Sequence, residues 1–470
     1  MSTVIGMVLS IIFPFQGGRM MKKNKFIALA LVAAMGMSLA ACGGSSSTTE
    51  TTAAPAAEAG STDGGFTATE LKVNIWDNNQ RAGLQEIADD WSAESGVKVS
   101  IEVVDWDNYW TLLEAGASGG EMPDVFWMHS NTAQMYMEND ILLQLDSYIE
   151  ADGVDMSVYY EGVKNLYTRS DGNIYALPKD HDTIALLYNK AIFDEYGVAY
   201  PDETWTYEDM YEAAKAITEG SNGDVYGVAM NTSNNQDGWY NLVYAYGGQV
   251  ITDDHKGTTI GSDEGKAGME MVRKLLTVGA PQSVVAETGT DSLFMSGKCA
   301  MITQGSWMIN SFYTAENSAD YAWAVLPYAD VNGNGACDEG ERWSAYNGLG
   351  WAASAATADP AAAWSLIKYF CSEEGQLKQA ELGVTMGGMY GVSDAFANAF
   401  EGMDVSAFIT VEETGSLFFR PYTRNTTVWE DALQQTGAFL DAWQNPEDAD
   451  LMATACDNAQ AIIENAIAQE

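Results

Sequence analysis

Residues 71–103, LKVNIWDNNQRAGLQEIADDWSAESGVKVSIEV, decide the fold. Apolar and polar residues alternate over 71–75 and again over 97–103, as in half-buried strands. Between these runs, apolar residues recur at helical spacing from Leu84 to Trp91, and Gly96 suits the position that ends a helix. This β-α-β unit predicts two parallel strands joined by a right-handed crossover.

The same alternation continues beyond this unit. Short apolar runs at 125–127 and 183–189 predict further strands, and Thr206 with Asp209 predicts a capped helix start. Asp359-Pro360 opens another helix, with proline at its first position. The fold class is therefore α/β. Because ligands of open α/β sheets bind beyond the carboxyl ends of strands, we expect site residues in the loops that follow the strands.

Length and charge limit the function classes. A chain of 470 residues exceeds one typical core, so we expect two lobes. It carries 66 acidic side chains against 22 lysines and arginines, a formal net charge of −44. Such a surface repels phosphate groups, which argues against nucleic acid or anionic lipid headgroups as partners.

The N-terminal segment predicts export. Residues 21–25 are basic, and the apolar run 26–39 is too short to span a bilayer comfortably. The run ends in Leu39-Ala40-Ala41-Cys42, which resembles a bacterial lipobox. We expect residues 1–41 to be a signal peptide and Cys42 to carry a lipid that holds the protein on the extracellular face of the membrane. The alternative is an ordinary signal peptide with a chance cysteine.

Two neighbouring stretches complete this picture. Residues 1–19 contain a second apolar run that does not fit a signal peptide, and we interpret them as a misassigned start, with Met20 or Met21 as initiator. Residues 43–65 contain no large apolar side chain, so 42–65 is predicted to be a flexible tether. The folded protein should begin near Phe66.

The remaining cysteines do not indicate a zinc site. Cys299, Cys337, Cys371 and Cys456 form no CxxC pair, and the chain contains three histidines. Whether these four thiols pair with one another stays open.

One loop matches a calcium-binding pattern. Residues 330–341, DVNGNGACDEGE, fit D-x-[DN]-x-[DN]-G-x5-E at every specified position. The flanking segments indicate strands, so we expect an isolated calcium loop with a structural role near the hinge; the alternative is an Asn/Gly-rich surface turn. The expected oxygen ligands come from Asp330, Asn332, Asn334, the Ala336 carbonyl, Asp338 and Glu341.

A series of short motifs gives a family resemblance. In chain order these are Pro123-Asp124-Val125-Phe126-Trp127; Tyr175-Ala176-Leu177-Pro178 with Leu187-Tyr188-Asn189-Lys190; Phe294-x-x-Gly297-x-x-Ala300-Met301 with Gly305-Ser306-Trp307; Val325-Leu326-Pro327; and residues 362–375. Their order resembles the family 1 extracellular solute-binding proteins, relatives of maltose-binding protein.

The resemblance implies a two-lobed, periplasmic-binding-protein-like fold of type II with a multi-segment hinge. One lobe would contain 66–181 and 328–391, and the other 182–327 and 392–470. It also implies a monomer that closes around a carbohydrate and delivers it to the membrane subunits of an ABC importer.

Sugar binding requires aromatic planes for C–H faces and polar groups for hydroxyls. Trp307 matches the stacking tryptophan of maltose-binding protein, whereas Ser130 stands where that protein has an acid, so the ligand is expected to differ from maltose. For each aromatic residue the alternative is core packing, which we prefer for Trp91 and Trp364. The predicted ligand contacts are Trp76, Asn79, Trp127, Ser130, Asn131, Asp180, Asp182, Trp239, Tyr240, Trp307, Asn347, Arg420 and Trp429.

Other function classes have less support. A glycosidase needs two carboxylates at a defined separation, which no motif marks, and no G-x-S-x-G nucleophile motif occurs. We therefore expect a binding protein and not an enzyme. A sugar receptor for a membrane sensor, or a binder of a non-sugar solute, would use the same fold and cleft.

Overall fold

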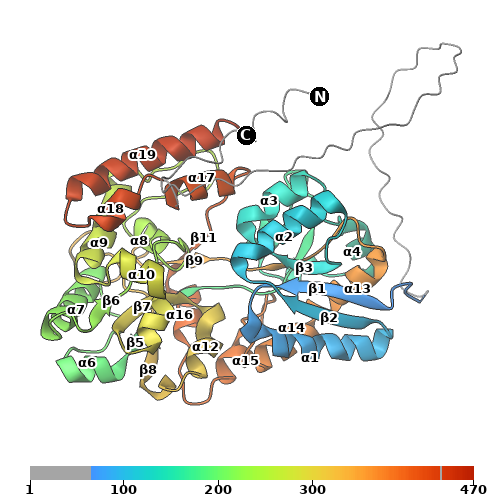
Figure 1. Cartoon of the computed structure of the whole chain (residues 1–470), viewed down its shortest axis with the longest axis horizontal. Helices are drawn as coiled ribbons and strands as arrows, with labels where there is room; N and C mark the ends of the chain where they lie inside the picture. The colour runs from blue at the N-terminus through green and yellow to red at the C-terminus, as the bar shows by residue number, and fades with distance from the viewer. Residues whose placement is uncertain (1–64, 435–436) are drawn as a thin grey trace, which may run out of the picture. The chain divides into compact units, whose positions relative to one another are not determined.

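The computed structural model describes residues 65–434 and 437–470. The predicted signal peptide, Cys42 and residues 42–64 of the tether lie outside these ranges. The described chain forms two α/β lobes, each built around its own sheet (Figure 1). Within these ranges, no helix combines the length and apolar character needed to cross a membrane.

The first lobe contains a five-stranded sheet in the order β2-β1-β3-β10-β4. β1 pairs parallel to β2 and β3, whereas β10 runs antiparallel to both of its neighbours. Its strands are β1 (Glu70–Ile75), β2 (Lys98–Val103), β3 (Val125–Met128), β4 (Ala176–Pro178) and β10 (Gly350–Ala353). Its helices are α1 (Asn78–Ser95), α2 (Trp106–Gly119), α3 (Ser130–Glu138), α4 (Asp146–Asp152), η1 (Met156–Val158), α5 (Glu161–Leu166), α13 (Pro360–Phe370) and α14 (Glu373–Glu381).

The β-α-β unit predicted at 71–103 is confirmed. Asp77 caps the start of α1 by accepting a hydrogen bond from the Asn79 backbone N–H, and Gly96 ends the helix at φ 74°. This left-handed conformation favours glycine because a Cβ would be strained there. Leu84 and Trp91 on α1 are buried against the sheet, which confirms the prediction that Trp91 packs in the core.

The second lobe contains a four-stranded sheet in the order β6-β7-β5-β8 and a two-stranded sheet of β9 and β11. Its strands are β5 (Ile184–Asn189), β6 (Tyr226–Val228), β7 (Cys299–Gly305), β8 (Tyr321–Ala324), β9 (Trp343–Tyr346) and β11 (Ser416–Phe419). Its helices are α6 (Lys190–Tyr196), α7 (Tyr207–Gly220), α8 (Tyr240–Ala245), α9 (Asp263–Val278), α10 (Gln282–Thr288), α11 (Thr290–Met295), η2 (Ser306–Met308), α12 (Ile309–Tyr313), η3 (Ser318–Asp320), α15 (Ser393–Asn398), α16 (Ala407–Thr414), α17 (Thr426–Gln434), α18 (Leu440–Gln444) and α19 (Ala449–Ile467).

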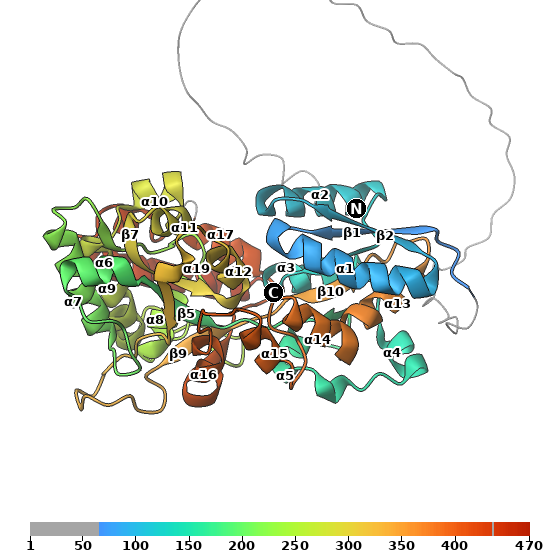
Figure 2. The same ribbon diagram turned by 90° about the horizontal axis from the view of Figure 1, so that it is seen from below.

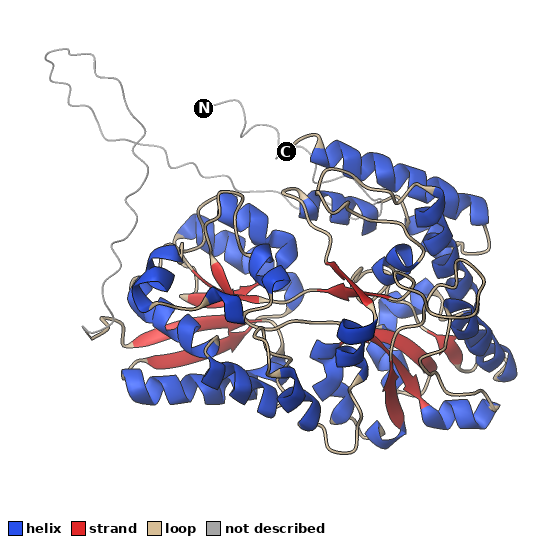
Figure 3. Ribbon diagram, turned by 180° about the vertical axis from the view of Figure 1, so that it is seen from behind, coloured by secondary structure: helices blue, strands red, loops and turns tan. Residues whose placement is uncertain are grey.

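Several extended segments connect the lobes (Figures 2 and 3). The segment between β4 and β5 forms isolated bridges from Asp182 to Asn347 and from Asp180 to Gly387, so the connections run side by side as a hinge. Trp343 and Ala345 pack with the core of the second lobe. β9 pairs with β11 and not with the first sheet. The chain therefore returns to the first lobe near residue 347, whereas the expected position was residue 328.

The four cysteines of the described chain are free thiols; Cys337 is exposed, and Cys299, Cys371 and Cys456 are buried. The Thr206–Asp209 capping box and the Asp359 cap with proline at the start of α13 are both present as predicted. Trp364 on α13 is fully buried, which confirms its core reading.

Candidate functional site

The candidate site begins where strands of the first sheet end. β1 and β3 are parallel neighbours, so the residues after them, Trp76 and His129, leave the sheet at the same edge. Their ring centroids lie 6.3 Å apart. This is the edge at which an open α/β sheet binds its ligand.

Four tryptophans gather at this edge and are called here the tryptophan cluster: Trp76, Trp106, Trp110 and Trp127. The Trp76 ring lies 5.1 Å from Trp106, 5.9 Å from Trp110 and 4.9 Å from Trp127, centroid to centroid. Trp106, the first residue of α2, remains 40% exposed and lies 5.4 Å from the His129 ring. Its exposed ring is the surface of the cluster that is available to stack on a ligand.

Trp127 has the opposite environment. Its indole is fully buried, with the Lys179 ammonium 4.5 Å from the ring centroid. The strand β3 is buried on both faces, so each of its side chains enters a core. Trp127 therefore packs against Trp76, with the two rings nearly perpendicular. The predicted contact of Trp127 with a ligand remains a prediction.

Three predicted residues of the second lobe are also fully buried. The Trp239 indole donates a hydrogen bond to Asn235 at 2.9 Å, and the Trp429 indole donates one to Thr423 at 3.1 Å. The Tyr240 hydroxyl donates one to Glu430 at 3.0 Å. All three rings are part of the hydrophobic core of the second lobe. Their predicted contact with a ligand is untested.

Five polar side chains meet at the hinge, and we call them the polar nest: His129, Asp182, Gln236, Asn347 and Arg420. The Asn347 amide Nδ2 lies 3.0 Å from Gln236 Oε1 and 3.3 Å from His129 Nε2. Asp182 pairs with Asn347 through the backbone, and Arg420 follows β11, whose pairing with β9 places it beside Tyr346. The nest therefore joins both lobes and the hinge.

The charges of the nest are compensated. The Arg420 guanidinium contacts both oxygens of Glu430, at 2.7 and 3.0 Å. Burial, together with the positive charge of Arg420, lowers the pKa of His129 to about 3, so its imidazole is neutral. Burial and the neighbouring Asp180 carboxylate raise the pKa of Asp182 to about 8.

Several buried polar atoms around the nest lack a hydrogen-bond partner. They are Arg420 Nη1, Gln236 Nε2, Asn347 Oδ1 and the Ser130 hydroxyl. All four residues are at least nine-tenths buried. A buried donor or acceptor without a partner costs ~1–3 kcal/mol, so these atoms mark a place where a ligand would supply the missing bonds.

Asp180 has a different role. Its carboxylate lies 2.5 Å from the Lys179 ammonium and accepts a hydrogen bond from the Leu349 N–H at 2.6 Å. Both oxygens are thus engaged within the hinge, and the structure gives Asp180 a positioning function. Its predicted contact with a ligand is untested.

The remaining predicted residues lie on both sides of the cleft. Trp307 in η2 is partly buried and covers Gly305, where a Cβ would lie 1.9 Å from the ring; this explains why glycine precedes it. The exposed Asn79 amide donates a hydrogen bond to Ser311 of α12 at 2.8 Å, which links the lobes. The Asn131 side-chain Oδ1 lies 2.8 Å from His129 Nδ1, and Asn347 Nδ2 lies 3.3 Å from His129 Nε2.

Sequence reasoning missed Trp106, His129 and Gln236. Trp106 follows the predicted strand 97–103, so the strand-end rule that selected Trp76 would also have selected it. Gln236 gave no such signal, because its proximity to Asn347 depends on a contact between segments far apart in the sequence.

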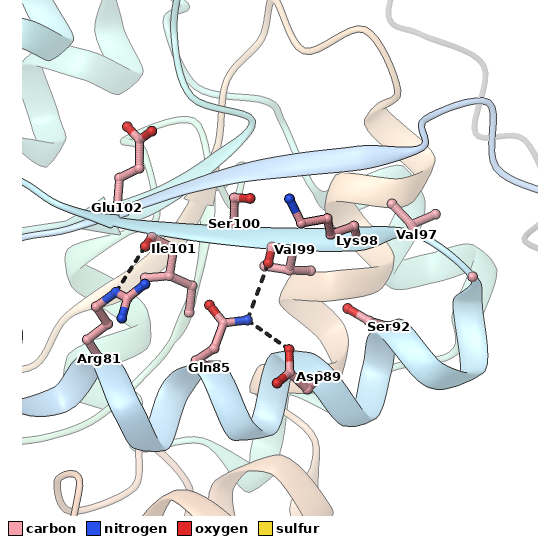
Figure 4. Close-up of a pocket in the computed structure, with 11 residues that line it drawn as sticks. Arg81, Gln85, Asp89, Ser92, Val97, Lys98, Val99, Ser100, Ile101 and Glu102 are labelled. Carbon is pink, nitrogen blue, oxygen red and sulfur yellow. Dashed lines mark hydrogen bonds between the residues drawn. The ribbon is translucent and has the colours of Figure 1, made fainter.

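A surface groove lies away from this site, between α1 and β2 (Figure 4). Arg81 and Gln85 of α1 donate hydrogen bonds to the Ile101 and Val99 carbonyls of β2, at 3.2 and 3.3 Å. β2 is the outer strand of its sheet, so these side chains cover its open edge and block pairing with another chain.

The predicted calcium loop folds around its own side chains. Asn332 Nδ2 donates hydrogen bonds to Asp338 at 2.7 Å and Glu341 at 3.3 Å. The backbone N–H groups of Asn334 and Gly335 donate to Asp330 at 3.0 and 3.1 Å. Amide groups thus stand between the carboxylates, and within residues 65–434 and 437–470 no three His, Cys, Asp or Glu side chains are placed to share an ion.

Residues 76–377 match the model of the bacterial extracellular solute-binding proteins. The maltotriose-binding protein of Pyrococcus abyssi is 25% identical over 66% of this chain and 65% of its own length. The galactooligosaccharide-binding protein of Bacillus subtilis is 24% identical over 63% of this chain and 66% of its own. The matches thus span about two-thirds of these relatives' length.

Solved structures agree on the fold. An ABC substrate-binding protein from Listeria monocytogenes in complex with cycloalternan has a TM-score of 0.72 at 20% identity, covering 86% of this chain and 99% of its own. The GacH receptor of Streptomyces glaucescens has a TM-score of 0.69 at 20% identity, covering 86% and 98%. The predicted two-lobed α/β fold is confirmed.

Proposed function

Because the chain belongs to the bacterial extracellular solute-binding proteins, we propose that it captures a carbohydrate between its lobes and delivers it to an ABC importer. The relatives named above bind maltotriose and galactooligosaccharide, and a further relative is named as a maltooligosaccharide ABC transporter solute-binding lipoprotein. These names support a mono- or oligosaccharide ligand. They are binding proteins, and we expect no turnover of the bound sugar.

One observation carries the proposal: an exposed indole and unpartnered polar atoms occur together at the ligand-binding edge of the sheet. Trp106 offers an aromatic plane beside His129, and Asn347 and Arg420 offer unpaired hydrogen-bonding atoms near the same histidine. A pyranose presents flat C–H faces and a ring of hydroxyls, which require this combination. Trp76, Asn79, Asn131, Asp182 and Trp307 would complete the contacts.

The test is a thermal-shift screen of the purified mature protein against mono- and oligosaccharides, followed by calorimetry on each hit. A sugar present at a hundred times its dissociation constant should stabilise the protein by ~2.7 kcal/mol. Chromatography of the incubated sugar would check that it is unchanged. No shift with any sugar would overturn carbohydrate binding, and new products would identify an enzyme.

We further propose that Cys42 carries the lipid and that the monomeric protein works on the outer face of the cell membrane. The lipobox-like segment supports this proposal. Metabolic labelling with a fatty acid should mark the wild-type protein and leave Cys42→Ala unlabelled. Equal labelling of both would overturn the assignment.

We propose, finally, that the loop 330–341 binds calcium in a structural role. Its side chains and the Ala336 carbonyl supply the oxygen donors that calcium prefers, once the asparagine amides rotate. A chelator should lower the melting temperature of the wild type, and Glu341→Gln should remove that response. Glu339→Gln, in the same loop but outside the ligand pattern, is the control. A melting temperature indifferent to calcium and chelator would refute the proposal.

A further inference from the structure

The His181 side chain joins three separate segments of the chain. It lies in the segment between β4 and β5, and its Nδ1 is 2.5 Å from the carbonyl oxygen of Gly387, in the segment between α14 and α15. Its Nε2 is 2.7 Å from Oε1 of Glu412, in the last turn of α16. Both ring nitrogens therefore face an oxygen that accepts hydrogen bonds. An imidazole carries a proton on each nitrogen only as the cation, so this arrangement suits a protonated His181.

Two tyrosine rings enclose this contact. The Tyr160 centroid lies 4.2 Å from that of His181, and the Tyr346 ring lies 5.7 Å away at an interplanar angle of 23°. Burial raises the pKa of Tyr160 to about 12 and also raises the pKa of Tyr346, so both hydroxyls are neutral near pH 7. His181 is fully buried, and the Glu412 side chain is 15% exposed. Water therefore has little access to the imidazole, and a neutral ring would leave a lone pair facing one of its two acceptors, at a cost in stability.

Glu412 supplies the charge that keeps the proton on His181. Burial alone would lower the pKa of His181, but the contact with Glu412, assisted by Asp182 on the same segment, raises it above the usual value of 6.5. Burial and the neighbouring Asp180 raise the pKa of Asp182 itself to about 8, so its carboxyl is largely protonated at neutral pH. Asp180 is paired with Lys179 at 2.5 Å. Glu412 is therefore the acid whose removal should affect His181 most.

The two ends of α16 are held in different ways. Near its start, Phe408 is buried in a hydrophobic core, and its carbonyl accepts a hydrogen bond from the Thr183 hydroxyl at 2.7 Å. Near its end, the contact of Glu412 with His181 holds the helix on the hinge. The chain then enters β11, which pairs with β9 and leads to Arg420 of the polar nest. A change at Glu412 therefore acts on the last turn of α16 and on the strand that positions Arg420.

We propose that His181 and Glu412 form a pH-sensitive latch: the imidazolium holds the last turn of α16 on the hinge, and loss of its proton releases that turn and loosens β11. The direction follows from linkage. A histidine whose pKa is raised in the folded protein stabilises the fold at low pH, and this contribution is lost as the pH rises through the folded pKa. The latch needs no ligand and goes beyond the proposed function, because it makes the order of α16 and β11 depend on the acidity of the surroundings.

The protonation of His181 is tested by NMR on the purified mature protein with isotope-labelled histidine. The chain contains three histidines, so His129→Gln and His255→Gln identify the signals of His181 by elimination. Wild type should have both ring nitrogens protonated at about pH 6 and a titration midpoint above the usual 6.5. Glu412→Gln should lower this midpoint, whereas Glu413→Gln, the exposed neighbour on α16, should leave it unchanged. A ring that is neutral at about pH 6, or equal midpoints in the two variants, would overturn the proposal.

Hydrogen exchange tests the release itself. Protection factors, which remove the intrinsic effect of pH, should fall about tenfold over residues 412–419 as the pH rises through the His181 midpoint, in wild type and in Glu413→Gln. Glu412→Gln should show the lower protection at every pH, because the latch never forms. Glu412→Asp keeps the charge and should retain part of the fall, which separates loss of the latch from misfolding. Protection in wild type that does not change with pH, or a response of Glu412→Gln equal to that of Glu413→Gln, would refute the latch.

Discussion

Replacing Trp106 with alanine tests the aromatic half of the site. The residue is 40% exposed, and its uncovered ring lies beside His129 at the binding edge. A tryptophan can bury up to about 250 Å², so about 100 Å² remains for a ligand to cover. At ~25 cal/mol per Å² this is worth ~2.5 kcal/mol, or about half of that if a sugar ring covers one face only. The expected loss of affinity is therefore roughly tenfold to seventyfold.

The assay is calorimetric titration with the sugar found in the screen, at matched protein concentrations. Tyr200→Ala is the control, since Tyr200 is also 40% exposed but lies between α6 and α7 of the second lobe. Because Trp106 also contacts Trp76 and Trp110, the melting temperature without sugar reports any loosening of the tryptophan cluster. Trp106→Phe keeps an aromatic plane and should recover part of the affinity.

A change smaller than twofold for Trp106→Ala would refute this reasoning. The ring would then face away from the ligand, and its exposure would be ordinary surface. A loss shared equally by Tyr200→Ala would also contradict it, because an effect on stability alone would then explain both.

Three other changes test the hinge and the closed state. Asn79→Ala removes an exposed hydrogen bond between the lobes, so sugar dissociation measured by stopped flow should accelerate only about twofold to fivefold. Glu430→Gln leaves the buried Arg420 guanidinium without its counterion and should lower the free energy of unfolding in urea by ~3 kcal/mol. Burial alone would lower the pKa of His181, but its hydrogen bond and charge interaction with Glu412 raise it above the usual value. This pair therefore stabilises the fold fully below the unfolded-state pKa of about 6.5, and the contribution is lost as the pH rises through the folded pKa. Glu412→Gln should flatten that decline, which begins above about pH 6.5.

Each of these has a contrary outcome. As a control, Glu208→Gln breaks the more exposed ion pair with Lys274 and should lower the free energy of unfolding by no more than ~1 kcal/mol. An equally small loss for Glu430→Gln would contradict the argument that burial makes the Arg420–Glu430 pair important. An unchanged dissociation rate for Asn79→Ala would exclude its bond from the liganded state. A pH profile of stability identical in wild type and Glu412→Gln would remove the His181 pair as its cause.

The sequence predicted local structure well because local signals are complete within a few residues. Asp77 and Gly96 bound α1, and Asp359 with Pro360 starts α13, as their positions indicated. Such caps depend on backbone groups within the same helical turn. The parallel pairing of β1 with β2 follows from the crossover rule and needs no knowledge of the rest of the fold.

The site was harder to predict because burial depends on both faces of a strand. Trp127 stands at a strand end, yet β3 is covered on both faces, so the indole is buried and Trp76 and Trp106 face the binding edge. Trp429 was predicted to face the cleft only from the family resemblance. It lies on a helix, and its indole donates a hydrogen bond to Thr423 within the core of the second lobe. Arg420 lies next to Tyr346, the neighbour of Asn347, because β9 pairs with β11, a long-range contact with no local signature.

The distribution of charge explains how such a hinge can open. The buried ion pairs Lys179–Asp180 and Arg420–Glu430 each join residues that are close in sequence, so their members move together when the lobes separate. Links between the lobes are instead neutral, as at Asn347, or exposed, as between Arg424 and Glu138 at 3.7 Å. Opening therefore separates hydrogen bonds worth about 1 kcal/mol each and leaves the Lys179–Asp180 and Arg420–Glu430 pairs intact. A closing energy of this size would let a ligand enter, and contacts of the ligand with both lobes would then shift the equilibrium towards closure.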